Sequence, residues 1–249
     1  MNTYEEMDRG RGEESGPLFL GDWDRVLFVH YEVPAHALQP CCPYELDTYE
    51  GMAYVSLVAF TLREMRLAKL APWGNCLTAP IATHNFLNVR TYVRHRGDVG
   101  IYFLREWIPN RISLLMGPII YGLPYRYAES SYKHPNQSGA IEGSVTRHAL
   151  GQFSYRGKVE YEETCEKADT ESITYWLTER YLAFTKNRER SFRFKVWHRP
   201  WVLHPVDLTV EDDSLLENTE PYWGEVHFSS AYFCPRLDRV EMGRPVRIS

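Results

Sequence analysis

Two short segments combine residue types that recognise small polar ligands. In the first, residues 88–93, Asn88, Arg90 and Tyr92 occupy alternate positions, and alternate side chains of a strand share one face. A guanidinium binds a carboxylate through two parallel hydrogen bonds, whereas amide and phenol groups hydrogen-bond other oxygens. Arg90 is therefore the candidate carboxylate anchor, with Asn88 and Tyr92 as further substrate contacts. The same alternation is typical of a solvated antiparallel strand, so both interpretations remain open.

The second segment, residues 122–126, is a Gly/Pro turn that presents Tyr125 and Arg126. Tyr125 is a candidate catalytic acid or base, provided that a neighbouring arginine lowers its pKa. Arg126 is a candidate substrate contact, although strand alternation would turn it away from Tyr125. His30, inside an apolar segment, is a second catalytic candidate because histidine titrates near pH 7. The alternative for His30 is a hydrogen-bonded core residue.

Apolar alternation and turn residues predict the elements that hold these side chains. Strands are expected at 26–31, 53–62, 87–95, 101–107, 125–133, 140–148, 152–161, 181–185, 192–197, 226–228 and 237–248. Turns are expected at residues 96–100, which form a hairpin, and at Pro135-Asn136 and Arg156-Gly157. Helices are expected at 35–41, 112–121, 170–179 with Asp169 as its cap, and 210–217.

This order has no alternation of single strands with single helices, so the predicted fold is mainly β (α+β). A curled antiparallel sheet, β-barrel-like, would carry a few short flanking helices. The acidic, Gly-rich residues 1–16 predict a mobile tail, and residues 17–249 predict one domain. Residues 68–83 are irregular and are either a lid over a cavity or an ordinary connector.

Composition narrows the function classes. The chain has 249 residues, a net charge of -5 and a pI of about 6.0, which gives no basic surface for nucleic acid. Five cysteines without a CxxC pair predict reduced thiols in a cytoplasmic protein. No signal peptide, membrane span, metal-ligand spacing, P-loop, GxGxxG or GxSxG motif is present, so neither a membrane partner nor a metal or other cofactor is expected. Edge strands make a homodimer possible.

Five motifs, taken in order, resemble the YqjF-like family of uncharacterised bacterial proteins, within the acetoacetate-decarboxylase-like superfamily. They are residues 26–34, 88–93, 122–126, 177–181 and 198–201. The resemblance implies a curled antiparallel β-structure enclosing a cavity. It also implies a Schiff-base lysine after a Gly-x-Pro turn, followed by a second lysine. Gly122-Leu123-Pro124 matches that turn, but Tyr125 and Arg126 stand where the two lysines would be.

A phenol cannot form the imine that a primary amine forms with a keto acid. The expected function is therefore binding of a small organic acid or carbonyl compound in an internal cavity, without Schiff-base chemistry. One alternative is a lyase or hydratase in which Tyr125 protonates an enolate while Arg90 stabilises its charge. Another is a structural or interaction protein with a filled barrel. The sequence does not decide whether any reaction is catalysed.

Overall fold

The computed structural model of the protein describes residues 16–70, 78–161, 169–219 and 226–248. Apart from Gly16, the predicted mobile tail lies outside these residues. The irregular segment 68–83 is described only at its two ends, which form the short 3-10 helices η2 (Ala68–Leu70) and η3 (Ala79–Ile81). The lid expectation therefore falls mainly outside the described residues. No helix in the described ranges is long and apolar enough to cross a membrane.

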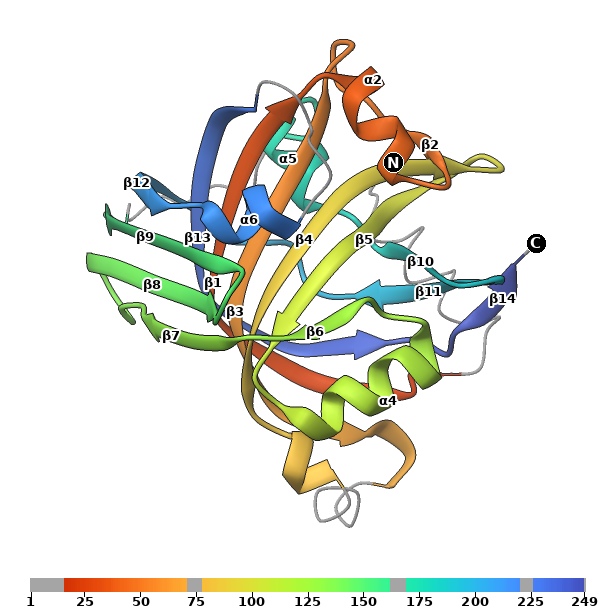
Figure 1. Ribbon diagram of the computed structural model, residues 1–249. Helices are drawn as coiled ribbons and strands as arrows, with labels where there is room; N and C mark the ends of the chain where they lie inside the picture. Colours follow the sequence, from red (N-terminus) through yellow and green to blue (C-terminus); the bar gives the residue numbers. More distant parts are fainter. Residues whose placement is uncertain (1–15, 71–77, 162–168, 220–225, 249) are drawn as a thin grey trace.

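Strands dominate the described chain (Figure 1). In the first half they are β1 (Phe19–Val33), β2 (Glu45–Leu46), β3 (Ala53–Leu67), β4 (His84–His95), β5 (Asp98–Ile108), β6 (Tyr125–Tyr127) and β7 (Glu129–Lys133). In the second half they are β8 (Gly139–Arg147), β9 (Gly151–Val159), β10 (Leu182–Asn187), β11 (Arg190–Trp197), β12 (His204–Asp212), β13 (His227–Met242) and β14 (Val246–Ile248). The helices are α2 (Ala35–Leu38), η1 (Gln39–Cys41), α4 (Arg111–Tyr121), α5 (Ile173–Thr178) and α6 (Ser214–Thr219).

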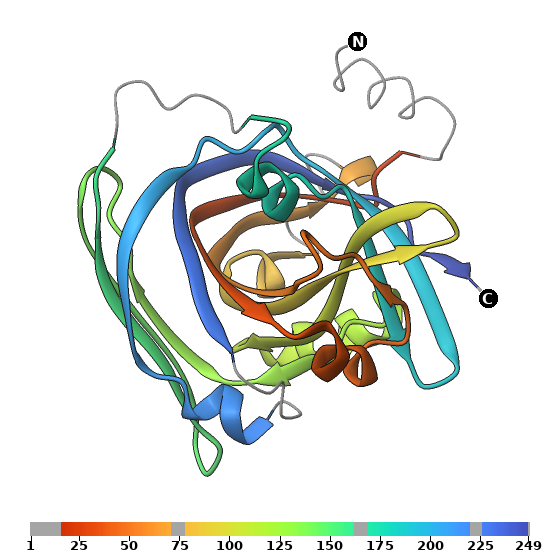
Figure 2. The ribbon, with the colours of Figure 1, turned by 90° about the horizontal axis from the view of Figure 1, so that it is seen from above.

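One sheet runs through the whole molecule, in the order β14-β11-β10-β5-β4-β3-β1-β13-β12-β9-β8-β7, with β2 beside β4 and β6 beside β5. Most neighbours are antiparallel, but β10 and β6 each lie parallel to β5. The additional pairing of β11 with β13 brings two distant parts of this order together. The sheet therefore curls around a common interior, as Figure 2 shows, while β7, β8, β9 and β12 form a second layer at its side.

Alternation along β1 divides the apolar core in two. Leu27 and Val29 pack in the cluster that also contains residues of β9 and β12, between the curl and the second layer. Val26 and Phe28 pack in the other cluster, which fills the interior of the curl. Strand residues of one parity therefore face the second layer and those of the other parity face the interior. This division decides which polar side chains can meet inside.

Two turns confirm sequence predictions and fix the strands of the site. The hairpin between β4 and β5 turns at Arg96 and Gly97, which have φ values of 53° and 90°. Positive φ at both positions is typical of the turns that join two antiparallel strands. Helix α4 starts at a cap in which Asn110 Oδ1 accepts from the N–H groups of Ile112 and Ser113. It ends at Gly122, whose φ of 68° is the left-handed conformation that favours glycine.

Some predicted boundaries are wrong. Arg156 and Gly157 lie inside β9, where a side chain at Gly157 would meet the backbone oxygen of Asp207 at 2.3 Å. Gly157 therefore allows the close approach of β12 and does not form a turn.

The helix predicted at 210–217 begins too early. Its first residues belong to β12, which continues to Asp212, and α6 begins only at Ser214. Residues 227–242, which were expected to contain a break, form one continuous strand that pairs with β1 along most of its length. Acidic composition suggested a helix at 210–217, but pairing with β9 holds its first residues in the sheet.

Candidate functional site

Polar side chains from three neighbouring strands line up across the inner face of the curl. Asn88 on β4 is paired with Glu106 on β5, and Glu106 is paired with Tyr125 on β6. Paired residues of adjacent strands point to the same side of a sheet. The row therefore combines an amide, a carboxyl group and a phenol.

A second row starts two residues further along β4 and extends in the other direction, over β3 and β1. Arg90 on β4 is paired with Ser56 on β3, which is paired with His30 on β1. Tyr92 follows Arg90 on the same face and its ring packs in the interior cluster. These two rows define the inner polar cluster, made of His30, Ser56, Asn88, Arg90, Tyr92, Glu106 and Tyr125.

The strand that carries the predicted ligand contacts faces inward. Asn88, Arg90 and Tyr92 are only 6%, 5% and 0% exposed. The alternative in which these residues form a solvated strand face is therefore wrong. The reason is topological, because β4 has neighbours on both sides and its polar face closes against the interior of the curl.

Arg90 is a buried cation without a buried anion beside it. Its guanidinium lies 5.5 Å from the centre of the Phe28 ring, makes a long hydrogen bond, 3.5 Å, to the carbonyl of Leu177 and also interacts with the Tyr92 hydroxyl. Nε has no hydrogen-bond partner, and no carboxylate lies within 4.0 Å among the described residues. Burial lowers the pKa of Arg90, and the nearby Arg180 adds to this shift. An arginine nevertheless stays charged in proteins. Among the described residues, the positive charge of Arg90 therefore has no negative charge beside it.

Glu106 is a buried carboxyl group that the sequence did not single out. It is 3% exposed, and its Oε2 has no hydrogen-bond partner in the described part of the chain. Burial raises the pKa of Glu106 well above its ordinary value, because desolvation disfavours the charged form. Burial therefore favours the protonated form of Glu106, which can donate a hydrogen bond.

His30 belongs to an ordered chain of hydrogen bonds. Its Nδ1 lies 2.6 Å from Ser56 Oγ, which lies 2.5 Å from the Tyr92 hydroxyl, and that hydroxyl donates to the carbonyl of Leu177 at 2.8 Å. Burial, followed by the charge of Arg90, lowers the pKa of His30 to about 3. The expectation that His30 titrates near pH 7 is therefore not met in the unliganded protein, where the ring is neutral.

Tyr125 lies at the end of the first row, against helix α4. A side chain at Gly117 would meet its ring carbon Cε2 at 2.2 Å, so the absence of a side chain at Gly117 makes room for the phenol. Burial and the neighbouring Glu106 raise the pKa of Tyr125 well above its ordinary value. The sequence-based idea that an arginine lowers this pKa is wrong, and Tyr125 is a neutral hydrogen-bond donor at pH 7.

Arg126 lies outside the inner polar cluster. Its side chain is exposed and donates to the backbone oxygen of Tyr125, its own neighbour. Strand alternation turns it away from the interior, as the sequence pattern anticipated. We therefore leave Arg126 out of the site, although it stood among the predicted substrate contacts.

An ion-pair network holds α5 over the cluster. Arg180 pairs with Asp47 at 2.8 Å, and Asp47 also pairs with Arg94 at 2.7 Å. The Arg180 guanidinium lies 4.4 Å from the centre of the Trp176 ring. These contacts place the carbonyl end of α5, including Leu177, within reach of Tyr92. Backbone oxygens at the end of a helix lack partners within the helix, so side chains of the site satisfy them.

The described interior lacks the residues for two kinds of chemistry, imine formation by a lysine and metal binding. Every lysine of the described chain is exposed, at positions 69, 133, 158, 186 and 195. No group of three or more His, Cys, Asp or Glu side chains that could hold a metal occurs in the described ranges. The inner polar cluster is therefore one of hydrogen-bonding groups and a single guanidinium.

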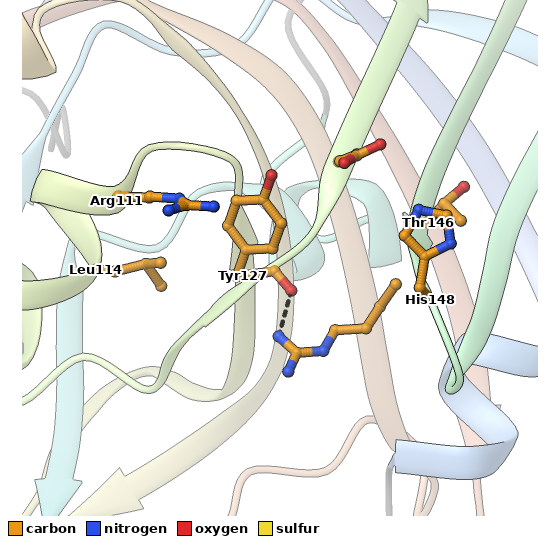
Figure 3. Close-up of a pocket in the computed structure, with 7 residues that line it drawn as sticks. Arg111, Leu114, Tyr127, Thr146 and His148 are labelled. Carbon is orange, nitrogen blue, oxygen red and sulfur yellow. Dashed lines mark hydrogen bonds between the residues drawn. The ribbon is translucent and has the colours of Figure 1, made fainter.

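A separate pocket lies between α4, β6 and the β7–β8 hairpin, with a cavity volume of about 470 Å³ (Figure 3). Arg147 is fixed there by donation to the Tyr127 carbonyl at 2.7 Å. Its other ionisable side chains, Arg111, Glu129 and His148, are exposed. Charges that remain in water gain little from a bound ion. The inner polar cluster, with its buried and unsatisfied groups, is the stronger candidate site.

The chain is similar to known proteins over most of its length. A model of the family DUF2071, described as an uncharacterised conserved protein, matches residues 21–237. The chain is 29% identical over 197 residues to the uncharacterised protein YqjF of Bacillus subtilis, covering 78% of each. Among solved structures it is similar to an acetoacetate decarboxylase-like enzyme from Sphingomonas wittichii, with a TM-score of 0.67, 13% identity and 94% of each chain covered. It is also similar to acetoacetate decarboxylase from Legionella pneumophila, with a TM-score of 0.63, 12% identity and coverage of 94% and 88%.

These similarities agree with the curled sheet described above. At 12–13% identity the two structures show the fold alone. They confirm the expected acetoacetate-decarboxylase-like fold.

Proposed function

Because this chain belongs to the DUF2071 family of uncharacterised conserved proteins and has an acetoacetate-decarboxylase-like fold, we propose that it binds a small organic acid or carbonyl compound on the inner face of its curled sheet. Arg90 holds the carboxylate. Asn88, Glu106 and Tyr125 hydrogen-bond the other polar atoms of the ligand. No imine is involved, because Tyr125 stands in the place of the Schiff-base lysine.

The observation that carries this proposal is the buried, uncompensated charge of Arg90. An isolated cation inside a protein is costly unless an anion or several hydrogen bonds offset its desolvation. Arg90 has a long hydrogen bond to a carbonyl and an interaction with the Tyr92 hydroxyl, but no carboxylate lies within 4.0 Å of it among the described residues. A ligand carboxylate would supply both the charge and the two hydrogen bonds that a guanidinium accommodates.

The neutral acids Glu106 and Tyr125 favour the lyase or hydratase version of this function. Both are protonated at pH 7 because burial raises their pKa values. Each can therefore donate a proton to a developing enolate whose charge Arg90 offsets. Following the bound acid by NMR distinguishes the two versions, since an enzyme converts the acid and a binding protein returns it unchanged.

The filled-interior alternative has less support. Side-chain atoms of His30, Asn88, Arg90 and Glu106 are buried without hydrogen-bond partners among the described residues. Native interiors contain few such atoms. An interior filled only by apolar side chains would leave all of them unsatisfied, whereas a polar ligand would satisfy them.

The test is a thermal-shift screen of the full chain against small keto, hydroxy and unsaturated carboxylic acids. A ligand at 100 times its dissociation constant stabilises a protein by about 2.7 kcal/mol. Arg90→Met should abolish the shift without lowering the melting temperature of the free protein, because it removes a buried unpaired charge. Arg94→Met is the matched control, since Arg94 lies on the same strand but pairs with Asp47. Equal binding by wild type and Arg90→Met would refute the proposal.

A further inference from the structure

The hydrogen-bond chain at His30 has a fixed direction. A backbone carbonyl only accepts, so the Tyr92 hydroxyl gives its proton to Leu177. Ser56 must then give its single proton to the Tyr92 oxygen, 2.5 Å away. The remaining contact, 2.6 Å between Ser56 Oγ and His30 Nδ1, therefore needs a proton on Nδ1.

This direction selects one tautomer of His30. A neutral imidazole has one N–H, and here Nδ1 carries it, so Nε2 presents a bare lone pair. Burial and the charge of Arg90 keep the ring neutral. Nε2 is buried and has no hydrogen-bond partner among the described residues. It is therefore a hydrogen-bond acceptor on the inner face, in the same row as Arg90.

A second buried acceptor lies in the neighbouring row. Oδ1 of Asn88 also lacks a hydrogen-bond partner in the described part of the chain. Asn88 and Arg90 are two positions apart on β4, which separates their backbones by about 7 Å. The site therefore offers one cation and two acceptors to a small ligand.

We infer that the acid bound here carries a hydroxyl group, which donates to His30 Nε2 while Arg90 holds the carboxylate; this inference rests on the proposed function. A hydroxy acid supplies the proton that the acceptor needs. The matching oxo acid would place a carbonyl oxygen against the lone pair of Nε2, and the deoxy acid would leave Nε2 unsatisfied. Sites built to hydrogen-bond a hydroxyl reject analogues that lack it.

The test compares matched acids by titration calorimetry on the full chain. Both enantiomers of lactate and of 2-hydroxybutyrate are compared with their oxo partners, pyruvate and 2-oxobutyrate, and with their deoxy partners, propionate and butyrate. We expect at least one hydroxy acid to bind ten times more tightly than its oxo and deoxy partners. Equal or tighter binding of the oxo or deoxy acid would overturn the inference and leave the proposed function standing, provided that Arg90→Met abolishes that binding.

Ser56→Ala tests the tautomer itself. Without the serine acceptor, the proton of His30 is free to move to Nε2, so the preference for the hydroxy acid should fall toward unity. The ratio of hydroxy-acid to deoxy-acid affinity is the readout, because Ser56 also hydrogen-bonds Tyr92. Tyr92→Phe, which removes the donor to Leu177, provides a second variant should Ser56→Ala not fold.

Persistence of the full preference in Ser56→Ala and in His30→Leu would contradict the role of His30. Absence of binding by every acid, or binding unaffected by Arg90→Met, would reject the proposed function and this inference with it.

Discussion

Arg90 and Glu106 are two ionisable residues that respond differently to burial in one interior. Arg90 keeps its charge because the intrinsic pKa of a guanidinium is too high for desolvation to neutralise it. In Glu106 the same burial raises the pKa of the carboxyl group and so favours its neutral form. Within the described residues, the inner polar cluster thus holds the charge of Arg90 without a carboxylate beside it, together with hydrogen-bond donors and acceptors, which is the complement of a monoanionic ligand.

The neutrality of Glu106 gives a prediction at the residue scale. The folded protein holds a proton on Glu106 that the unfolded chain releases above its ordinary pKa of 4.5, so this residue makes the wild type less stable as pH rises. Glu106→Gln removes the titration. The variant should therefore gain stability relative to wild type by about 1.4 kcal/mol per pH unit, from near pH 5 up to the folded pKa.

Urea unfolding between pH 5 and pH 9 measures this difference, with Glu45→Gln, an exposed position on β2, as the control. Parallel stability curves for wild type and Glu106→Gln would show that Glu106 is ionised in the folded protein.

At the scale of elements, helix α4 and strand β6 meet at a contact that only glycine permits. Gly117 leaves the space that the Tyr125 ring occupies, and an added Cβ would lie 2.2 Å from Cε2 of that ring. Close packing of this kind fixes the phenol at the edge of the inner polar cluster. The absence of a side chain at Gly117 of α4 therefore determines where the Tyr125 ring lies.

Gly117→Ala should destabilise the protein by about 1–2 kcal/mol, because overpacking outweighs the better helix propensity of alanine. In the background of Tyr125→Ala the same change should be neutral or stabilising, since the obstructing ring is gone. A double-mutant cycle from thermal or urea unfolding gives the coupling between the two positions. Equal costs of Gly117→Ala in both backgrounds would rule out this contact.

Helix α5 carries the carbonyl that orders the hydrogen-bond chain of His30, so its start also matters. The sequence predicted Asp169 as its cap, but the cap is Ser172, whose Oγ accepts from the N–H of Tyr175 at 3.2 Å. Asp169 instead accepts from the N–H of Glu171 in the turn before the helix. The predicted helix is therefore shorter at its beginning.

Ser172→Ala should cost about 1 kcal/mol of stability, as the loss of a helix cap does. Asp169→Ala is the matched control and should cost less than about 0.5 kcal/mol, since it changes an exposed turn. Urea unfolding of both variants decides between the two caps. A larger cost for Asp169→Ala would restore the sequence-based assignment.

At the scale of the whole molecule, several histidines are buried in their neutral form. Burial lowers the pKa of His30 to about 3 and those of His84, His134 and His198 to about 4. The unfolded chain binds protons at these residues below pH 6.5, whereas the folded protein does not. Stability therefore rises with pH across this window and is lost as the pH falls from 7 toward 4. The single carboxyl group of Glu106 acts in the opposite direction.

His134 offers the cleanest test because it lies in the second layer, away from the inner polar cluster. Its ring nitrogens lie 2.7 Å from the Arg25 carbonyl and 2.6 Å from the Tyr155 hydroxyl. Replacing it with Gln should reduce the stability lost between pH 7 and pH 5 by about 2 kcal/mol relative to wild type. Thermal unfolding at the two pH values measures this, with the exposed His148→Gln as control. An unchanged pH dependence would show that His134 is charged in the folded state.

The sequence by itself determined the strands, the hairpin turn at Arg96-Gly97 and the shared face of Asn88, Arg90 and Tyr92, because these depend on local alternation and turn chemistry. Only the tertiary structure decided that this face points inward, since burial of a strand depends on the neighbours that pair with it. The family resemblance indicated the fold, but not the ionisation states inside it.

Glu106 shows most clearly why the sequence pattern did not reveal part of the site. Strict alternation from Phe103 would put Arg105 inside and Glu106 outside. A bulge makes Arg90 pair with Phe103 and Val89 with Arg105, which leaves Leu104 unpaired and reverses the faces beyond it. That reversal arises from the pairing of two strands, and no pattern within residues 98–108 specifies it. The ionisation states of Glu106 and His30 follow from the same burial, which exists only once the curl has closed.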